Sequence, residues 1–263
     1  MARDLLDCAL AAARAAVAVH RRHLGRVTAD QWTEKGVADF VTDVDREAEA
    51  RIVEHILARF PDHAVLAEEG GGVGSDSAEW LWIVDPLDGT TNYLHGYPAY
   101  AASIAVAHRG ELVAGVVACA ATGEEWWAVR GGGAYHNGRR IRVSGLDDLR
   151  LALIGTGFPF KAVDRLPEYL GQFDAVLRNT AGIRRAGSAA LDLCHVATGY
   201  FDGFWELLLY PWDIAAGILI VREAGGVVSA LEEGRDLLAG PGGVLAGNPV
   251  IHDALGRLLA TVG

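Results

Sequence analysis

The sequence is poor in cysteine, with three among 263 residues. Cys8, Cys119 and Cys194 are an odd number, lie far apart and have apolar neighbours. Such spacing argues against a disulfide framework and against a zinc site. The simplest interpretation is three reduced thiols, as expected of a cytoplasmic protein.

Long apolar runs and basic clusters are also missing. No charge-free segment approaches the roughly 20 residues that a membrane-spanning helix needs, and the first residues lack the basic start and apolar run of a signal peptide. The net charge of -11 argues against a general nucleic-acid binder, which requires a basic face. We therefore expect a soluble cytoplasmic protein with no nucleic-acid and no membrane partner.

The composition is that of a protein with a large core, because 51% of the residues are hydrophobic and 22% are charged. In residues 100–143, apolar runs separated by glycine- and asparagine-containing turns predict an antiparallel sheet. After Ser144, strands and helices alternate. These patterns predict an α+β fold with an N-terminal α+β lobe, residues 1–145, and a C-terminal α/β lobe, residues 146–263.

Two helices are predicted near the N-terminus. Residues 4–24 carry an apolar stripe at helical spacing and end in a basic turn, whose His20 and His23 we expect to be solvated. A second helix begins after Thr42, with Asp45 placed to complete a capping box. The glycine-rich residues 70–74 are expected to form a mobile lid or linker, since their spacing does not fit a dinucleotide-binding loop.

The stretch 80–92 contains the strongest chemical signal. Five large apolar residues predict a buried strand that ends in two carboxylates, Asp85 and Asp88, at a turn fixed by Pro86. With the carbonyl of Leu87 they offer three hard oxygen ligands for a cation, and the polar residues that follow could open a helical turn suited to phosphate. An ordinary turn explains these residues, taken alone, equally well.

Other acidic residues also stand at the ends of predicted elements. Glu68 and Glu69 follow a short apolar strand, and Asp213 opens an apolar helix. Each alone fits a solvent-facing loop acid or a helix cap. Their coincidence with Asp85 and Asp88 favours a joint site over separate structural roles.

In this combination the chain resembles the inositol monophosphatase-type phosphatases, a magnesium-dependent, lithium-sensitive group. The matching segments occur in the family's order: DFVTDVD at 39–45, EE at 68–69, WIVDPLDGTTNY at 82–93, GSAA at 187–190 and PWDIAAG at 211–217. The resemblance implies a layered α-β-α-β-α sandwich of the inositol monophosphatase/fructose bisphosphatase type. It also implies a homodimer.

The resemblance implies a role for each matched residue. Two Mg²⁺ ions and a weaker third are expected; Asp85 would bridge the first two, and Glu68 would help to hold the third. The expected metal ligands are Glu68, Asp85, Leu87, Asp88 and Asp213, most of them in the N-terminal lobe. The expected catalytic residues are Glu68, Thr90 and Asp45, of which the last two would orient the attacking water and take its proton. The expected substrate-binding residues are Asp88, Gly89, Thr90, Arg184, Ser188, Ala189, Glu206 and Asp213.

The expected activity is hydrolysis of a polyol phosphate monoester, foremost inositol 1-phosphate, by a metal-activated water. Fructose-1,6-bisphosphatase and histidinol-phosphate phosphatase of the same fold are alternatives, and Glu206 could instead be a surface residue at a strand end. A haloacid dehalogenase-type phosphatase is disfavoured, because Pro86 stands where its nucleophilic aspartate would be. The alternative from another class is a non-catalytic module that binds Mg²⁺ and a phospho-ligand, or a protein.

Overall fold

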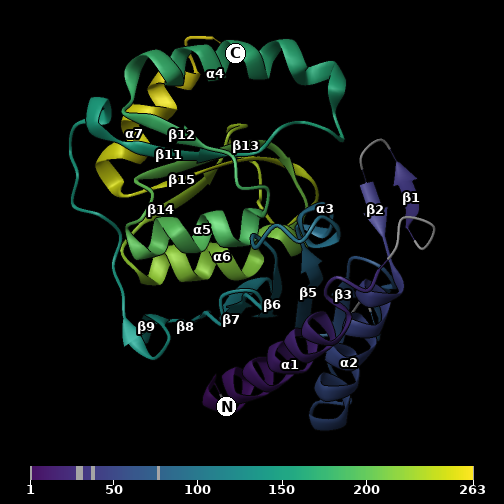
Figure 1. Cartoon of the computed structure of the whole chain (residues 1–263). Coiled ribbons are helices and arrows are strands. Elements are labelled where there is room, and N and C mark those ends of the chain that lie inside the picture. Colours follow the sequence, from purple (N-terminus) through teal and green to yellow (C-terminus); the bar gives the residue numbers. More distant parts are fainter. Residues whose placement is uncertain (1, 28–31, 37–38, 76–77, 263) are drawn as a thin grey trace.

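The computed structural model describes residues 2–27, 32–36, 39–75 and 78–262. Five layers are stacked in the order helices, sheet, helices, sheet, helices (Figure 1). Helices α1 (Ala2–His23) and α2 (Asp43–Arg59) cover the outer face of the larger sheet. Helices α5 (Ala189–Thr198) and α6 (Pro211–Glu223) lie between the two sheets. The predicted α+β layered sandwich is confirmed.

The larger sheet has eight strands in the order β10-β9-β8-β7-β6-β5-β3-β4. All its neighbouring strands are antiparallel except β3 and β5. Its strands are β3 (Ala64–Ala67), β4 (Gly71–Val73), β5 (Trp80–Asp88), β6 (Ala101–His108), β7 (Glu111–Ala118), β8 (Glu125–Val129), β9 (Gly133–His136) and β10 (Arg139–Arg140). A separate hairpin pairs β1 (Thr33–Gly36) with β2 (Asp39–Val41), and the short helix α3 (Thr90–Leu94) follows β5.

The smaller sheet has the order β12-β11-β13-β15-β14. Its strands are β11 (Leu153–Thr156), β12 (Gly182–Arg184), β13 (Gly203–Leu209), β14 (Val227–Ala230) and β15 (Gly242–Gly247). Helices α4 (Leu166–Asn179) and α7 (Pro249–Leu259) cover its outer face. Two short 3₁₀ turns, Leu149–Leu151 and Val163–Arg165, complete the connections.

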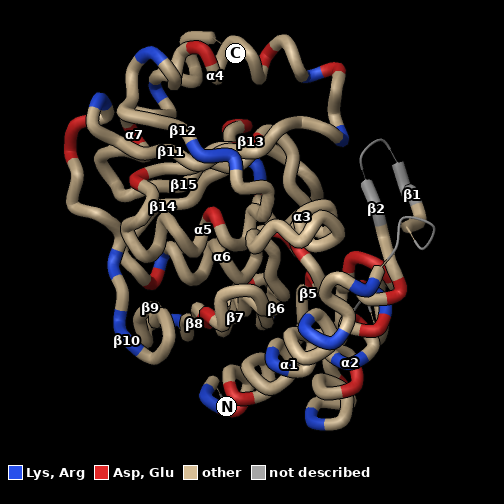
Figure 2. The backbone as a smooth tube through the Cα atoms, viewed as in Figure 1, with Lys and Arg blue, Asp and Glu red and all other residues tan. Residues whose placement is uncertain are grey.

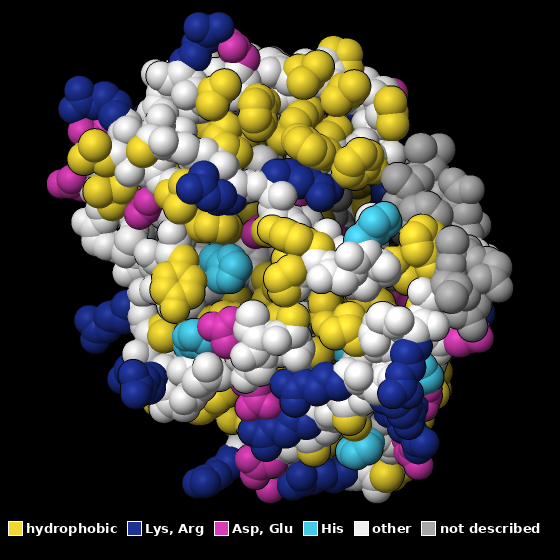
Figure 3. All heavy atoms as spheres, in the orientation of Figure 1, with side chains coloured by type: hydrophobic (Ala, Val, Ile, Leu, Met, Phe, Trp, Pro, Cys, Tyr) yellow, Lys and Arg dark blue, Asp and Glu magenta, His cyan; other side chains and the backbone are white. Residues whose placement is uncertain are grey.

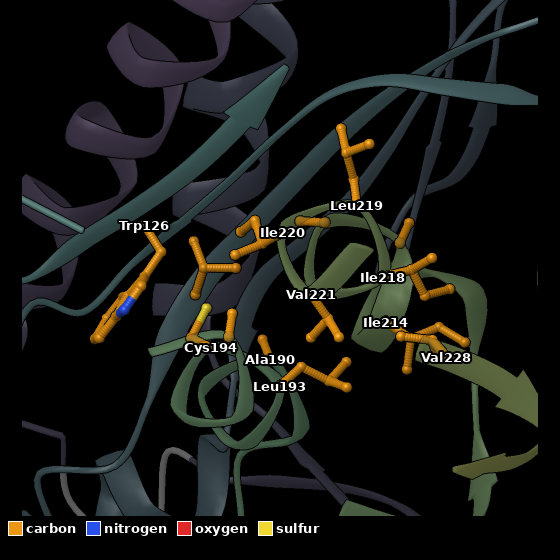
Figure 4. Close-up of a cluster of buried hydrophobic side chains, with 14 of the residues drawn as sticks. Trp126, Ala190, Leu193, Cys194, Ile214, Ile218, Leu219, Ile220, Val221 and Val228 are labelled. Carbon is orange, nitrogen blue, oxygen red and sulfur yellow. The ribbon is translucent and has the colours of Figure 1, made fainter. Parts of the chain in front are cut away.

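Strand alternation sorts the core into the layers that the helices cover. On β5, Ile83 faces α5 and α6, whereas Trp82 and Val84 face α1 and α2. Between the two sheets, the apolar side chains of α5 and α6 interdigitate with Trp126 of the larger sheet (Figure 4). This central layer packs against both sheets in one continuous core, which does not mark a boundary at residue 145. The division of the chain into two lobes there stays a prediction.

Two features of the N-terminal half differ from expectation. The glycine-rich segment predicted as a lid contains strand β4, which pairs with β3 and closes one edge of the larger sheet. His20, predicted to be solvated, is fully buried. The helical stripe places His20 one turn beyond Ala16 on the buried face of α1, so position on the helix outweighs its basic neighbours.

Along α1 and α2, basic and acidic positions are interspersed (Figure 2). No helix in the described part of the chain is long and apolar enough to cross a membrane. Apolar side chains gather over α4 (Figure 3), where the exposed ones include Leu166, Leu170 and Leu177.

The close approach of α5 and α6 gives a test of the central layer. A Cβ added at Gly217 would lie 2.5 Å from Leu193 Cδ1 and 2.7 Å from Leu193 Cβ. We expect Gly217→Val to lower the free energy of unfolding in urea by about 1–3 kcal/mol, because the helices must move apart. Gly145→Val is the matched control, since a Cβ there meets nothing within 4 Å. Equal stability of both variants would contradict this packing.

Candidate active site

A bulge at the end of β5 turns two aspartates toward the same layer. Asp85 pairs with Ser103 and Asp88 pairs with Ala101, so three steps along β5 oppose two steps along β6. In a regular strand, residues three apart face opposite sides of the sheet. The extra residue brings both carboxylates to the side of α5 and α6, while Leu87 packs with the core under α1 and α2.

Each aspartate is anchored through one oxygen. Asp85 Oδ1 accepts a hydrogen bond from the Leu87 N–H at 2.9 Å. Asp88 Oδ2 accepts from Ser188 Oγ at 2.6 Å and from the Ala190 N–H at 2.8 Å, at the N-terminus of α5. The bulge is therefore fixed both to its own turn and to the central helical layer.

Glu68 and Asp213 reach the same place from neighbouring elements. Strands β3 and β5 run parallel with Ala67 beside Val84, so Glu68, the first residue after β3, lies next to Asp85 on the neighbouring strand. Asp213 lies in the first turn of α6, where its Oδ2 accepts from the Tyr210 N–H at 2.7 Å. Ser103, the strand partner of Asp85, donates to the Trp212 carbonyl and so ties β6 to this helix start.

The four carboxylates line one cavity of about 240 Å³. Burial raises the pKa of Asp85 well above its ordinary value, and its three acidic neighbours raise that pKa further. Burial also raises the pKa of Asp88, although the hydrogen bonds from Ser188 and Ala190 oppose the shift. Several negative charges in one buried cavity are costly without a cation, so the arrangement favours a positively charged ligand.

Thr90 and Asp45 form a hydrogen-bonded pair beside the bulge. Thr90 Oγ1 lies 3.0 Å from Asp45 Oδ1 and 3.0 Å from the Leu87 carbonyl oxygen, and can donate to either. Asp45 Oδ2 accepts from the backbone N–H and the hydroxyl of Thr42, which completes the predicted capping box of α2. Burial raises the pKa of Asp45 to about 6. A carboxyl group with this pKa can hold a proton near neutral pH.

Gly89 connects the bulge to α3 in a conformation that requires glycine. Its φ is +87°, and an added Cβ would lie 2.7 Å from the Ala99 carbonyl oxygen. Asn92 on α3 donates from Nδ2 to the same carbonyl at 2.6 Å and to Ala186 O at 2.9 Å. The turn is thus tied to the chain that precedes α5, across from the carboxylates.

The opposite wall of the cavity comes from the C-terminal half. Glu206 on β13 lies against Gly157, where an added Cβ would lie 2.1 Å from the Glu206 carboxyl carbon. Burial raises the pKa of Glu206 well above its ordinary value, while Arg185 lowers it. The Arg185 guanidinium lies 4.9 Å from the ring centre of Phe158 and 5.1 Å from that of Phe160.

The cavity brings together most of the residues expected from the sequence. Its lining includes Glu68, Asp85, Leu87, Asp88, Gly89, Thr90, Ser188, Ala189, Glu206 and Asp213. Asp45 adjoins it through Thr90. Arg184 does not line it: that side chain is exposed on β12, and the cavity has Arg185 instead. Arg185 is the first residue after β12, and its guanidinium lies over the rings of Phe158 and Phe160 at the cavity.

Sequence reasoning missed one segment of the wall. Residues 157–161, Gly-Phe-Pro-Phe-Lys, follow β11 and line the cavity with two aromatic rings and Lys161. The sequence pattern that singled out Asp85 and Glu68, a polar or glycine residue directly after an apolar run, also occurs at Gly157 and could have identified this segment. Strand β11 is flanked by parallel neighbours on both sides, and such strand ends commonly border ligand sites.

The donor set fits a hard divalent cation. Carboxylates and a backbone carbonyl are the ligands that Mg²⁺ takes, and histidine and cysteine are absent from the cavity lining within the described residues. In those residues no three Asp, Glu, His or Cys side chains close tightly around one point.

The comparisons with known proteins agree with this geometry. The family model described as "Inositol monophosphatase family" matches residues 1–262. The chain is 47% identical to the Nus factor SuhB of Pseudomonas aeruginosa, covering 96% of this chain and 94% of that protein. It is 45% identical to an inositol-1-monophosphatase of Mesorhizobium japonicum, covering 97% and 96%. The extragenic suppressor protein suhB of Bartonella henselae superposes with a TM-score of 0.91 at 41% identity, covering 97% and 98%.

The fold and the cavity therefore define a phosphoric monoester hydrolase. The chain belongs to the inositol monophosphatase family, whose members are generally metal-dependent.

The crowding of carboxylates predicts a gain of stability when one is neutralised. In EDTA, we expect Asp85→Asn to raise the free energy of unfolding by about 1 kcal/mol, because the amide keeps an oxygen for the Leu87 N–H and removes a buried charge. Urea denaturation of both proteins measures this. A metal-free variant that is less stable than the wild type would show that the four carboxylates do not repel one another.

Proposed function

We propose that the chain is a Mg²⁺-dependent phosphatase that hydrolyses a polyol phosphate monoester, foremost inositol 1-phosphate. The observation that carries this proposal is the β5 bulge, which directs Asp85 and Asp88 into a cavity shared with Glu68 and Asp213. The inositol-1-monophosphatase of Mesorhizobium japonicum supports the choice of substrate.

The proposed metal ligands divide into two overlapping sets. Glu68, Asp85 and the Leu87 carbonyl would hold one ion, and Asp85, Asp88 and Asp213 would hold a second. Glu68 would help to hold a weaker third. When bound, these ions lower the pKa of a water molecule and stabilise the leaving oxygen. We also expect inhibition by lithium, as the family resemblance implies.

Thr90 and Asp45 would orient the attacking water. When Thr90 Oγ1 donates its proton to Asp45 Oδ1, a lone pair of that oxygen is left to accept a hydrogen bond from water in the cavity. Asp45 would receive a proton through Thr90, consistent with its pKa of about 6. Glu68, which follows β3 and lines the same cavity, would also contact this water. The backbone N–H groups of Gly89 and Thr90 would bind the phosphate.

The alcohol part of the substrate would contact the opposite wall. Glu206 can exchange hydrogen bonds with ring hydroxyls, and Gly157 leaves the space that its carboxyl group occupies. Ser188 and Ala189 at the start of α5 would complete this pocket. Arg184 is not part of the proposed pocket, whereas Arg185 is.

A non-catalytic binding module is the second candidate, favoured by one observation. The Pseudomonas aeruginosa relative is named as a Nus factor, and it matches this chain over nearly its whole length. Phosphate release with Mg²⁺ from inositol 1-phosphate, fructose 1,6-bisphosphate, histidinol phosphate and NADP discriminates the candidates. Release from none of them would make the binding module the leading function.

A homodimer is part of the proposal, because the family resemblance implies one. The exposed apolar residues Leu166, Leu170 and Leu177 follow one another at helical spacing on α4 and provide a face that a second copy could cover (Figure 3).

The bridging role of Asp85 predicts a severe loss of activity. We expect Asp85→Asn to lower Mg²⁺-dependent phosphate release about 100-fold or more while the protein stays folded, because both proposed ions lose a charged ligand. Asp253→Asn, a change at an exposed position on α7, serves as the control and should keep full activity. Near-normal turnover of the Asp85 variant would refute the metal assignment.

Glu206 predicts a change in substrate preference. Glu206→Gln should reduce kcat/KM about tenfold for inositol 1-phosphate, because the amide cannot reproduce the hydrogen bonds of the carboxyl group. The same variant should hydrolyse p-nitrophenyl phosphate nearly as well as the wild type, since that ester has no ring hydroxyls. Equal losses of kcat/KM on both substrates would mean that Glu206 does not recognise the alcohol part of the substrate.

A further inference from the structure

His20 connects helix α1 to the bulge that carries the active-site aspartates. It lies in the last turn of α1, is fully buried, and its Nε2 is 2.9 Å from the carbonyl oxygen of Pro86. Tyr93 on α3 donates from its hydroxyl to the His20 carbonyl at 2.9 Å. One residue of α1 therefore contacts both the Asp85–Asp88 turn and the helix that follows it.

The hydrogen bond identifies the tautomer of His20. A carbonyl oxygen only accepts, so Nε2 must carry the proton and donate to Pro86. Burial lowers the pKa of His20 to about 4, so the imidazole is neutral at ordinary pH, with Nδ1 unprotonated. The ring is enclosed by Tyr93 and Tyr100, whose centres lie 6.0 and 6.2 Å away.

Within the described residues, few other hydrogen bonds hold the backbone of the bulge at Pro86 and Leu87. Pro86 has no N–H group, and the β5–β6 register skips from Asp85 to Asp88, which leaves Pro86 and Leu87 outside the regular ladder. The Leu87 N–H donates to Asp85 Oδ1 within the turn, and the Leu87 carbonyl oxygen lies 3.0 Å from Thr90 Oγ1. The hydrogen bond from His20 ties the Pro86 carbonyl to a separate layer of the molecule.

We propose that His20 is a positioning residue of the active site: its Nε2–H holds the Pro86 carbonyl and thereby sets the bulge so that Asp85, Leu87 and Asp88 present their oxygens to the cavity. This inference rests on the proposed function, because the oxygens it positions are the proposed Mg²⁺ ligands. His20 itself is fully buried and is not among the residues that line the cavity.

Three substitutions at this position separate hydrogen bonding from packing. His20→Gln keeps an N–H donor at the end of a side chain of similar reach. His20→Asn carries the same amide one methylene shorter, and His20→Leu has no donor. Gln172→Leu is the matched control, because it leaves the buried Trp205 indole N–H without its partner in the core beneath α4, away from the site.

The experiment measures three quantities for each protein. These are the free energy of unfolding in EDTA, the Mg²⁺ dissociation constant by calorimetry, and the rate of phosphate release from inositol 1-phosphate as a function of Mg²⁺. We expect His20→Leu and His20→Asn to weaken Mg²⁺ binding about tenfold or more, since partners that orient metal ligands have effects of this size. His20→Gln should stay within about threefold of the wild type, and Gln172→Leu should lose stability without loss of Mg²⁺ affinity.

Two results would overturn the proposal. One is Mg²⁺ affinity and turnover in His20→Asn and His20→Leu that match those of Gln172→Leu. The other is a His20→Gln variant as impaired as His20→Leu. If His20→Leu does not fold, the Mg²⁺ affinities of His20→Gln and His20→Asn alone decide whether the hydrogen bond positions the bulge.

The calorimetric measurement keeps this inference distinct from the proposed function. A wild type that binds Mg²⁺ but releases no phosphate would refute the proposed activity, while the affinities of the variants still decide the role of His20. A wild type that binds no Mg²⁺ would refute both.

Discussion

The site depends on one extra residue in strand β5. Without the bulge between Asp85 and Asp88, these carboxylates would point to opposite faces of the sheet, and only one could face the cavity. Other contacts of the site follow from the direction that the bulge imposes: Ser188 and Ala190 on α5 bind Asp88, and Ser103 on β6 links Asp85 to the start of α6. Burial and the neighbouring carboxylates raise the pKa of Asp85, and the apolar layer formed by α5 and α6 between the two sheets holds these groups in place.

Local patterns predicted an α+β fold with acidic residues at the ends of its elements, whereas the layered sandwich and the roles of the site residues were implied by the family resemblance. Apolar runs that end in polar residues identified the tips of β3 and β5, and the parallel pairing of those strands brought Glu68 and Asp85 together. The capping box of Thr42 and Asp45 was also readable, since it involves residues three apart. The additional contact of Asp45 with Thr90 joins distant parts of the chain, and no local pattern indicates it.

The differences from expectation have separate physical causes. Arg184 was expected in the pocket from the resemblance, but Arg185, the first residue after β12, lines the cavity, and strand ends are poorly defined by sequence. The glycines of 70–74 indicated flexibility, but pairing with β3 makes them a strand. His20 stands among basic residues, as expected of an exposed helix end, yet the Pro86 carbonyl provides the partner that makes its burial possible. For His20 the deciding neighbour lies far away in the sequence.

The central pair of helices has a consequence for how the protein is made. Asp45, Asp85 and Asp213 come from widely separated parts of the chain, and the last of them arrives only with α6. During synthesis on the ribosome, the larger sheet can therefore emerge complete while its inner face has no cover and its acidic residues lack a partner wall. With the proposed ligand set, catalysis requires Asp213, so a nascent chain that ends before α6 would carry the aspartates of the bulge without a complete site.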